Sequence, residues 1–152
     1  MSSLLAFDEL DVLEHLKATC GTLFKQYGFE GDASEAEATK SFSAPALFVI
    51  PAADSASELA DSALIEHTVT PEFGVLIVTR SYRVNRKDES HTSLRALRLQ
   101  VHQALIQTGY TPPGCNRRVS YVGGNVIKYN EELTVRLDRF RTQYQFETHA
   151  QF

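Results

Sequence analysis

Cysteine is scarce in this 152-residue sequence, and long apolar runs are missing from it. Its two cysteines, Cys20 and Cys115, lie far apart and form no CxxC pair. We therefore expect neither a disulfide framework nor a cysteine-ligated zinc site, and this use of cysteine is typical of a reduced cytosolic setting. No apolar stretch approaches the ~20 residues that a membrane span requires. A basic segment followed by an apolar run, which would indicate a signal peptide, is also missing.

The motifs that most often carry chemistry are missing as well. The sequence contains neither the phosphate-binding patterns GxGxxG and GxxxxGK[ST] nor the nucleophile elbow GxSxG. Its five histidines have no HxxxH or HxH spacing, so only the fold could assemble a metal site from them. Glu66 and Glu72 are faint candidates for an acidic nuclease site, but the lysine usual on the same strand is absent. We therefore predict no catalytic residue, no metal and no cofactor.

Positive charge is scarce in the first half of the chain and abundant in the second. The residues up to Leu76 include 13 acidic side chains but only Lys17, Lys25 and Lys40, a formal balance of −10. From Ile77 on, 12 lysines or arginines stand against 6 acidic residues, a balance of +6. This asymmetry predicts an oriented contact, in which a basic surface meets an acidic one between copies or binds a polyanion. The alternative is a solvated surface of uneven sign.

Length and composition predict one globular domain that spans residues 1–152. A hydrophobic content of 43% and an aromatic content of 10% suffice for a packed core and argue against a disordered chain. Two stretches rich in small and acidic residues, about 30–43 and 52–61, are expected to be mobile acidic loops.

Apolar periodicity predicts two helices. The first begins at the capping residue Asp8, continues through apolar residues as far as Tyr27 and ends at Gly28. The second spans residues 92–108, with Thr92 or Ser93 as its cap and Gly109 at its end. Its expected inward stripe, which Leu99 and Ile106 widen, consists of Leu94, Leu97, Val101, Ala104 and Leu105. We expect Leu97, Val101 and Leu105 to be buried against the sheet that contains Val75, Ile77 and Val135.

Strands are predicted where short apolar runs alternate with turn signals: residues 45–51, 65–70, 73–84, 118–122, 126–130 and 133–146. Residues 65–70 and 73–84 are expected to pair with each other, joined at Pro71 and Glu72. The second of these carries apolar residues on both faces, which indicates a central strand covered on both sides. The sequence Gly123-Gly124-Asn125 predicts a hairpin turn. A bulge near Asp138 and Arg139 is expected in the last strand, where the apolar residues change parity.

The basic residues of the second half gather on a few elements: Arg80, Arg83, Arg86 and Lys87 at a strand end, Arg95 and Arg98 on a helix, Arg117 and Arg118 before the glycines, and Arg136, Arg139 and Arg141 on the last strand. They predict a basic surface for phosphate or for an acidic protein face. The alternative is that each arginine is solvated on the polar face of its element.

The order of these elements resembles that of the tail terminator (tail completion) proteins of long-tailed bacteriophages and Mu-like prophages. The resemblance covers most of the chain from Pro45 to Phe146. Its marks are the FVIP strand, a strand that contains VLIVTR, a helix that ends in LIQTGYTP, and YVGG before the closing strand. These marks are structural signatures and contain no catalytic residue.

The resemblance implies an α/β (α+β) fold, with a mostly antiparallel β-sheet on which an N-terminal helix and one central amphipathic helix pack. It implies a structural virion protein, not an enzyme, that forms a homohexameric ring, caps the tail tube, ends tube polymerisation and joins the tail to the head-side neck. Expected partners are further copies of the chain, the tail tube protein, neck or connector proteins, the sheath protein of a sheathed tail, and DNA that passes through the lumen without sequence-specific binding. The protein would be made in the host cytoplasm and lie at the head-proximal end of the virion tail, away from membranes.

Two other functions stay open: a different phage neck or head–tail joining protein, and a nucleic-acid-binding accessory protein that uses the C-terminal arginines. The candidates for the subunit interface or the lumen are the basic residues of two strands and a loop, with two aromatic residues of the last strand. They are Arg80, Arg83, Arg86, Lys87, Arg136, Arg139, Arg141, Tyr144 and Phe146.

Overall fold

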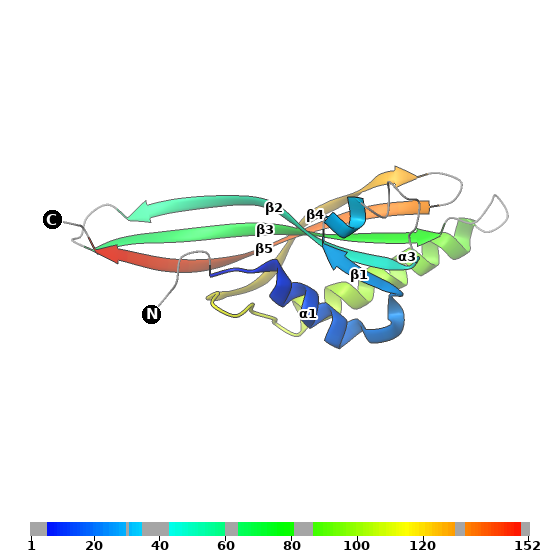
Figure 1. Cartoon of the computed structure of the whole chain (residues 1–152), viewed down its shortest axis with the longest axis horizontal. Helices are drawn as coiled ribbons and strands as arrows, with labels where there is room; N and C mark the ends of the chain where they lie inside the picture. The colour runs from blue at the N-terminus through cyan, green and yellow to red at the C-terminus, as the bar shows by residue number, and fades with distance from the viewer. Residues whose placement is uncertain are drawn as a thin grey trace.

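The computed structural model describes residues 6–29, 31–34, 43–59, 64–80, 87–129 and 133–149. In these ranges the chain forms a five-stranded sheet with the strand order β1-β2-β3-β5-β4. The strands are β1 (Gln26–Phe29), β2 (Ala46–Leu59), β3 (Leu64–Arg80), β4 (Arg117–Tyr129) and β5 (Leu133–His149). All neighbouring pairs are antiparallel except β1 and β2. The helices α1 (Glu9–Cys20) and α3 (Lys87–His102) lie on one face of the sheet (Figure 1). The predicted α+β fold class is confirmed.

Helix α1 begins where the sequence predicts and ends earlier than expected. The Asp8 carboxylate accepts a hydrogen bond from the Leu10 backbone N–H at 2.9 Å, which caps the helix. Gly21 ends it with a φ of +56°, a conformation that favours glycine, and a short 3₁₀ turn follows. The predicted continuation to Tyr27 is wrong, because Tyr27 and Gly28 lie in β1 and pair with β2.

Helix α3 begins at Lys87, so the predicted start at Thr92 is wrong. The apolar stripe marks only the part of the helix that packs on the sheet, and the polar first turn carries no such signal. Leu99 does not widen the stripe, because 54% of its surface is exposed. Ile106 does pack against the core. The predicted end is confirmed: Gly109 has a φ of +69°, and its N–H donates to the Ile106 carbonyl at 3.0 Å.

A π-helical turn, Gln103–Gln107, continues α3 and ties it to α1. The Thr108 N–H bonds to the Gln103 carbonyl, five residues back, and leaves the Ala104 carbonyl without its usual backbone donor. His15 of α1 donates from Nε2 to this carbonyl at 2.9 Å, and its ring stacks on Tyr110 with 3.7 Å between centroids. The irregular turn therefore creates the acceptor that joins the two helices.

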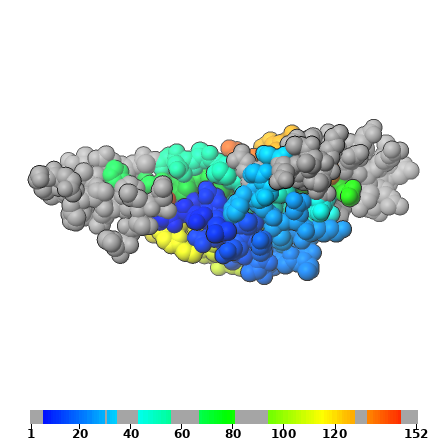
Figure 2. All heavy atoms as spheres, viewed as in Figure 1, coloured from blue at the N-terminus to red at the C-terminus, as the bar shows by residue number. Residues whose placement is uncertain are grey.

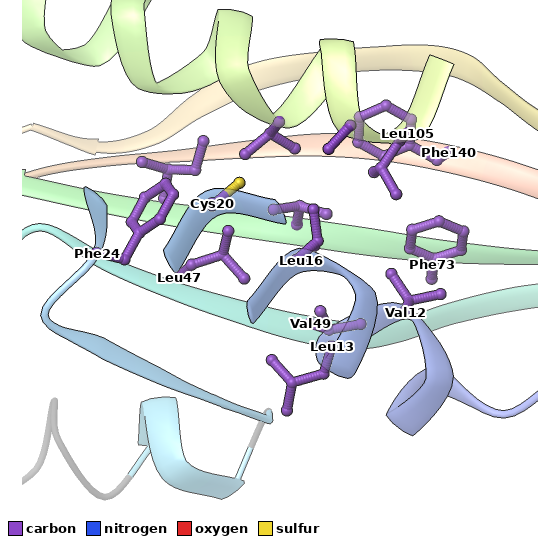
Figure 3. Packing of buried hydrophobic residues seen from close by; sticks show 14 of the residues in the cluster. Val12, Leu13, Leu16, Cys20, Phe24, Leu47, Val49, Phe73, Leu105 and Phe140 are labelled. Carbon is purple, nitrogen blue, oxygen red and sulfur yellow. The ribbon is translucent and has the colours of Figure 1, made fainter. Parts of the chain in front are cut away.

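The main core fills the space between the two helices and the sheet. From α1, Val12, Leu13, Leu16 and Cys20 point toward the sheet residues Leu47, Val49, Phe73 and Phe140, and Leu105 meets them from the other helix (Figure 3). The predicted stripe of the second helix is confirmed in its packed part, since Leu94, Val101, Ala104 and Leu105 are buried and Leu97 is partly buried against the same cluster.

A second, smaller cluster lies on the opposite face of the sheet. It consists of Ala46, Phe48, Leu76, Val78 and Val135, with Ala33 from a helical turn at residues 31–34. The prediction that β3 is a central strand covered on both sides is confirmed. Val75 and Ile77 share the main core with the α3 stripe, whereas Val135 of the same sheet projects to this second face.

Two predicted turns lie inside continuous strands. Residues 65–70 and 73–80 do not pair with each other but form one strand, β3, through Pro71 and Glu72. Pro71 is tolerated because it faces the register shift that β2 makes between Pro51 and Asp54. The predicted hairpin at Gly123-Gly124 is also wrong, since β4 passes through both glycines while paired with β5.

The expected loop at residues 52–61 is wrong as far as Leu59, because these residues extend β2. Residues 60 and 61 lie outside the described residues. Of the expected loop at 30–43, residues 31–34 form the helical turn named above, Ser43 is described without regular structure, and the rest lies outside the described residues.

The predicted bulge in β5 is wrong as well. Strand β5 pairs with β3 in one unbroken register from Leu133 to His149. Leu133, Val135 and Leu137 pack on one face and Phe140 on the other simply because odd and even residues of a strand alternate. The irregularities lie in β4, which shifts register against β5 at three places.

The sheet is much longer than the layer of helices that covers it. At one end β2, β3 and β5 continue past the helices as a three-stranded arm (Figure 1). The N-terminal segment covers the middle of the molecule in the space-filling view (Figure 2). The sheet therefore has a covered part, which contains the main core, and a projecting part, which does not.

Candidate functional site

The predicted interface residues do not form one cluster. Strands β3 and β5, which carry several of these residues, are neighbours in the sheet. Arg80 ends β3 and is exposed, whereas Arg136 points toward the helices and Arg139 and Arg141 toward the opposite face. Tyr144 is 3% exposed and belongs to the interior.

Three further predicted residues are less fully placed. Arg83 and Arg86 lie outside the described residues. Lys87 and Phe146 lie in α3 and β5, where their backbones are described.

Asp138, which sequence reasoning missed as a functional group, is the centre of a polar cluster between α3 and the sheet. Its side chain is 0% exposed. Arg98 donates to it from Nε at 2.8 Å and from Nη2 at 3.3 Å, and Arg136 donates from Nε at 3.0 Å. His102 donates from Nε2 at 3.2 Å, and the Tyr121 hydroxyl donates at 3.3 Å. The carboxylate therefore joins β5 to both α3 and β4.

The charges of this cluster hold Asp138 ionised. Burial by itself raises the pKa of the carboxyl, but hydrogen bonds from His102 and Arg98, the charge of Arg98 and the bond from Arg136 bring the pKa well below its usual value. Burial is the largest single influence on the pKa of Arg98 and lowers it, but the hydrogen bond to Asp138, the charge of Asp138 and the interactions with Tyr121 together raise it, so the net shift is upward. Two fixed positive charges around one negative charge make the cluster positive, and it is partly open to solvent through Arg98 and Arg136.

Gly124 makes room for this cluster. It lies directly opposite Asp138 on β4, and a Cβ added there would collide with the Asp138 carboxylate and come within 2.6 Å of the Leu137 carbonyl oxygen. The glycine pair therefore allows close approach of two strands and does not form a turn.

An aromatic row continues from the cluster into the core. Tyr121, Phe140 and Phe73 are cross-strand neighbours on β4, β5 and β3. Their ring centroids lie 5.5 Å apart for Tyr121 and Phe140 and 5.7 Å apart for Phe140 and Phe73. His102 packs edge-on against both Tyr121 and Phe140. These contacts pack the His102 ring between α3 and the sheet.

One signal in the sequence points to Asp138. It is the only acidic residue from Leu133 to Gln145, a stretch that also contains three arginines. A lone carboxylate among arginines on a strand is a candidate for a buried ion pair. Its partners on α3 and β4 could not be found in this way, because the sequence does not specify how the helix lies on the sheet.

Exposed apolar residues gather on the edge strand β4: Tyr121, Val122, Val126 and Ile127. The two cysteines lie elsewhere and are free thiols, and burial raises the pKa of both Cys20 and Cys115. Within the described ranges, no three His, Cys, Asp or Glu side chains come together as ligands for a metal. No helix in those ranges combines the length and apolarity that a membrane span requires.

Comparison with protein families matches residues 3–151, nearly the whole chain, to the family described as "Phage tail terminator protein". No curated protein matches the chain.

Proposed function

The chain belongs to the phage tail terminator family, and from this premise we propose that it forms a homohexameric ring that caps the tail tube, ends tube polymerisation and joins the tail to the head-side neck. The family assigns a structural role in tail completion, and the match over residues 3–151 is the observation that carries the proposal. The proposed partners are further copies of the chain, the tail tube protein and neck or connector proteins, with the sheath protein added in a sheathed tail. The proposed location is the head-proximal end of the virion tail.

An acidic patch and an exposed arginine on different surfaces of one subunit support a head-to-tail ring. Asp8, Asp11 and Glu14 cluster at the start of α1, where burial and then the repulsion of Asp8 and Glu14 raise the pKa of Asp11. Arg139 is exposed on the sheet face away from α1. In a head-to-tail contact two different surfaces meet, so patches on opposite faces of one subunit can pair between neighbours. Exposed ion pairs contribute only ~0–1 kcal/mol each. Such pairs would therefore orient neighbouring subunits and would not supply most of the affinity between them.

Apolar contact must supply most of the affinity between subunits. The end of β5 was the expected source, but Tyr144 is buried within its own subunit. We propose instead that the exposed Val122, Val126 and Ile127 of β4 form the apolar part of the contact.

The experiment is a reconstruction of assembled tails, combined with charge reversal. Six copies are expected at the head-proximal end of the tube. The variant Arg139→Glu should fold normally by circular dichroism but leave overlong or unjoined tails, because it repels the acidic patch of the neighbour. Arg95→Glu is the matched control: Arg95 is exposed on α3 and should tolerate reversal.

The outcomes separate the parts of the proposal. If tails with Arg139→Glu are normal, the proposed charged contact is wrong. If the ring contains another number of copies, the proposed hexamer is wrong. Absence of the protein from the tail end would overturn the function itself and favour the alternatives, a different neck protein or a nucleic-acid-binding accessory protein.

A further inference from the structure

A row of polar side chains crosses four strands on the sheet face away from α1 and α3. Ser55 of β2 is the register partner of Thr70 of β3, and Gln143 of β5 is the partner of Arg117 of β4. Gln143 donates from Nε2 to the Thr70 hydroxyl oxygen at 3.3 Å, which joins the two halves of the row. Directly opposed residues of antiparallel strands project on the same face, so all four side chains line one surface.

This row forms the floor of a cleft of about 250 Å³. Arg141 and Ser120, which are register partners on β5 and β4, also line the cleft. All the lining residues are polar: Ser55, Thr70, Arg117, Ser120, Arg141, Thr142 and Gln143. None of these lining residues is acidic. The cleft therefore combines two positive charges with several hydroxyl and amide groups.

The donors of the cleft are largely unused. Neither the Arg117 nor the Arg141 guanidinium makes a hydrogen bond or an ion pair with a described residue. Thr70 accepts from Gln143, so its own hydroxyl proton can still be donated. The Thr142 hydroxyl is already committed to the Arg117 carbonyl. The closest acidic residue in register is Glu72, the partner of Arg141, and it does not line the cleft.

We propose that this cleft binds a phosphate group. A phosphate offers several oxygens around one centre, and two guanidiniums with serine and threonine hydroxyls supply donors of the kinds that bind it. A single carboxylate has only two oxygens and would leave most of these donors unpaired. The phosphate can come from a nucleic-acid backbone or from free phosphate in solution. The proposal does not depend on the ring, because all seven lining residues belong to one subunit.

The test uses the full chain and four variants. Arg117→Gln and Arg141→Gln remove the two cleft charges. Arg118→Gln and Arg95→Gln are matched controls, because both are exposed arginines that lie outside the cleft and outside the proposed subunit contact. Arg118 instead approaches Gly109 on the helical side. Circular dichroism verifies that each variant is folded.

Inorganic phosphate is added first while backbone amide shifts are recorded by NMR. Shifts are expected at residues 55, 70, 117–120 and 141–143, and should be lost in the cleft variants but kept in the controls. Glu72→Gln should bind phosphate more tightly, because it removes the negative charge nearest to Arg141. The proposal is overturned if phosphate moves none of these amides, or if the cleft variants and the controls respond alike.

A fluorescent DNA duplex is added second, and its anisotropy gives the affinity. If the source is a nucleic-acid backbone, the double cleft variant should bind about tenfold or more weakly, while the double control changes little. If phosphate binds in the cleft but the duplex does not displace it, the site serves free phosphate. Duplex binding that all variants weaken equally is a general charge effect and counts against the cleft.

Discussion

The face of the sheet under α1 and α3 and the face turned away from them differ in how their polar groups are paired. Under the helices, Asp138 is fully buried, and Arg98 and Arg136 bond to it. On the other face, Arg117 and Arg141 have no partner among the described residues. Buried charges must be paired for the protein to fold, whereas unpaired exposed charges contribute little to folding. The first face therefore contributes to stability, and the second is the face on which we propose binding.

Of the changes considered, Asp138→Asn should lower the free energy of unfolding most. The amide keeps the shape of the side chain but leaves the two arginines of the cluster without a counter-charge. We expect a loss of ~3–5 kcal/mol in the free energy of unfolding, as for other buried pairs that lose one partner. Urea denaturation measures it, and Asp54→Asn, at an exposed position of β2, is the control with less than ~0.5 kcal/mol. Equal small losses in both variants would mean that the cluster is not structural.

Leu105→Ala should cost ~2–5 kcal/mol, because this side chain is fully buried in the main core. Leu99→Ala is the matched change on the exposed side of the same helical segment, and should stay within ~0.5 kcal/mol. Thermal or urea unfolding of both variants gives the values. A large loss at Leu99 would place the covered side of the helix elsewhere.

Gly124→Ala should cost ~1–3 kcal/mol, because the new methyl group collides with Asp138 and with backbone of β5. Gly31→Ala is the control, since a Cβ at Gly31 meets nothing within 4 Å. Chemical denaturation compares the two. If Gly124 tolerates alanine as well as Gly31 does, β4 and β5 are not so close at the cluster.

Acid should lower the free energy of unfolding through the buried Asp138. Its pKa is lowered by folding, so its contribution is complete above the unfolded value of ~3.9 and is lost as the pH falls below it. Between pH 7 and pH 3 this amounts to ~1 kcal/mol. NMR titration of the side-chain carboxyl carbon should find Asp138 still ionised at pH 3. A midpoint near 3.9 for Asp138 would contradict the proposed pairing.

Arg141→Gln should have the smallest effect on stability, within ~0.5 kcal/mol, because its guanidinium is exposed and has no partner within the described part of the chain. The same urea denaturation measures it beside Asp138→Asn. A loss comparable with that of Asp138→Asn would show that the far face also carries stability.

Burial could be predicted from the sequence better than strand boundaries could. The helical spacing of Val101 and Leu105 and the alternation of Phe73, Val75 and Ile77 report directly on which residues face a core. Pro71 and Gly124 were interpreted as turn residues, since local rules give that meaning to proline and glycine. Their actual reasons lie in other strands: Pro71 faces an irregular part of β2, and Gly124 faces a buried carboxylate.

The candidate site, too, could be predicted only in part from the sequence. The sequence locates every arginine but not its face: Arg136 and Arg139 are three residues apart on β5, an odd number, so Arg136 points to the helices and Arg139 to the other side. The cleft could not be predicted, because its seven residues come from four strands and meet only through the register of the sheet.

The irregular register of β4 also bears on self-association. Along its 13 residues this edge strand departs from its partner's register three times. A regular, flat edge strand presents a row of unpaired backbone groups to which further strands can bind without limit. Irregularities of this kind interrupt that row and hinder such pairing. We therefore expect neighbouring copies to meet through side chains and not to prolong the sheet, so that a protein waiting in the cell for its place in the particle is kept from fibrous growth.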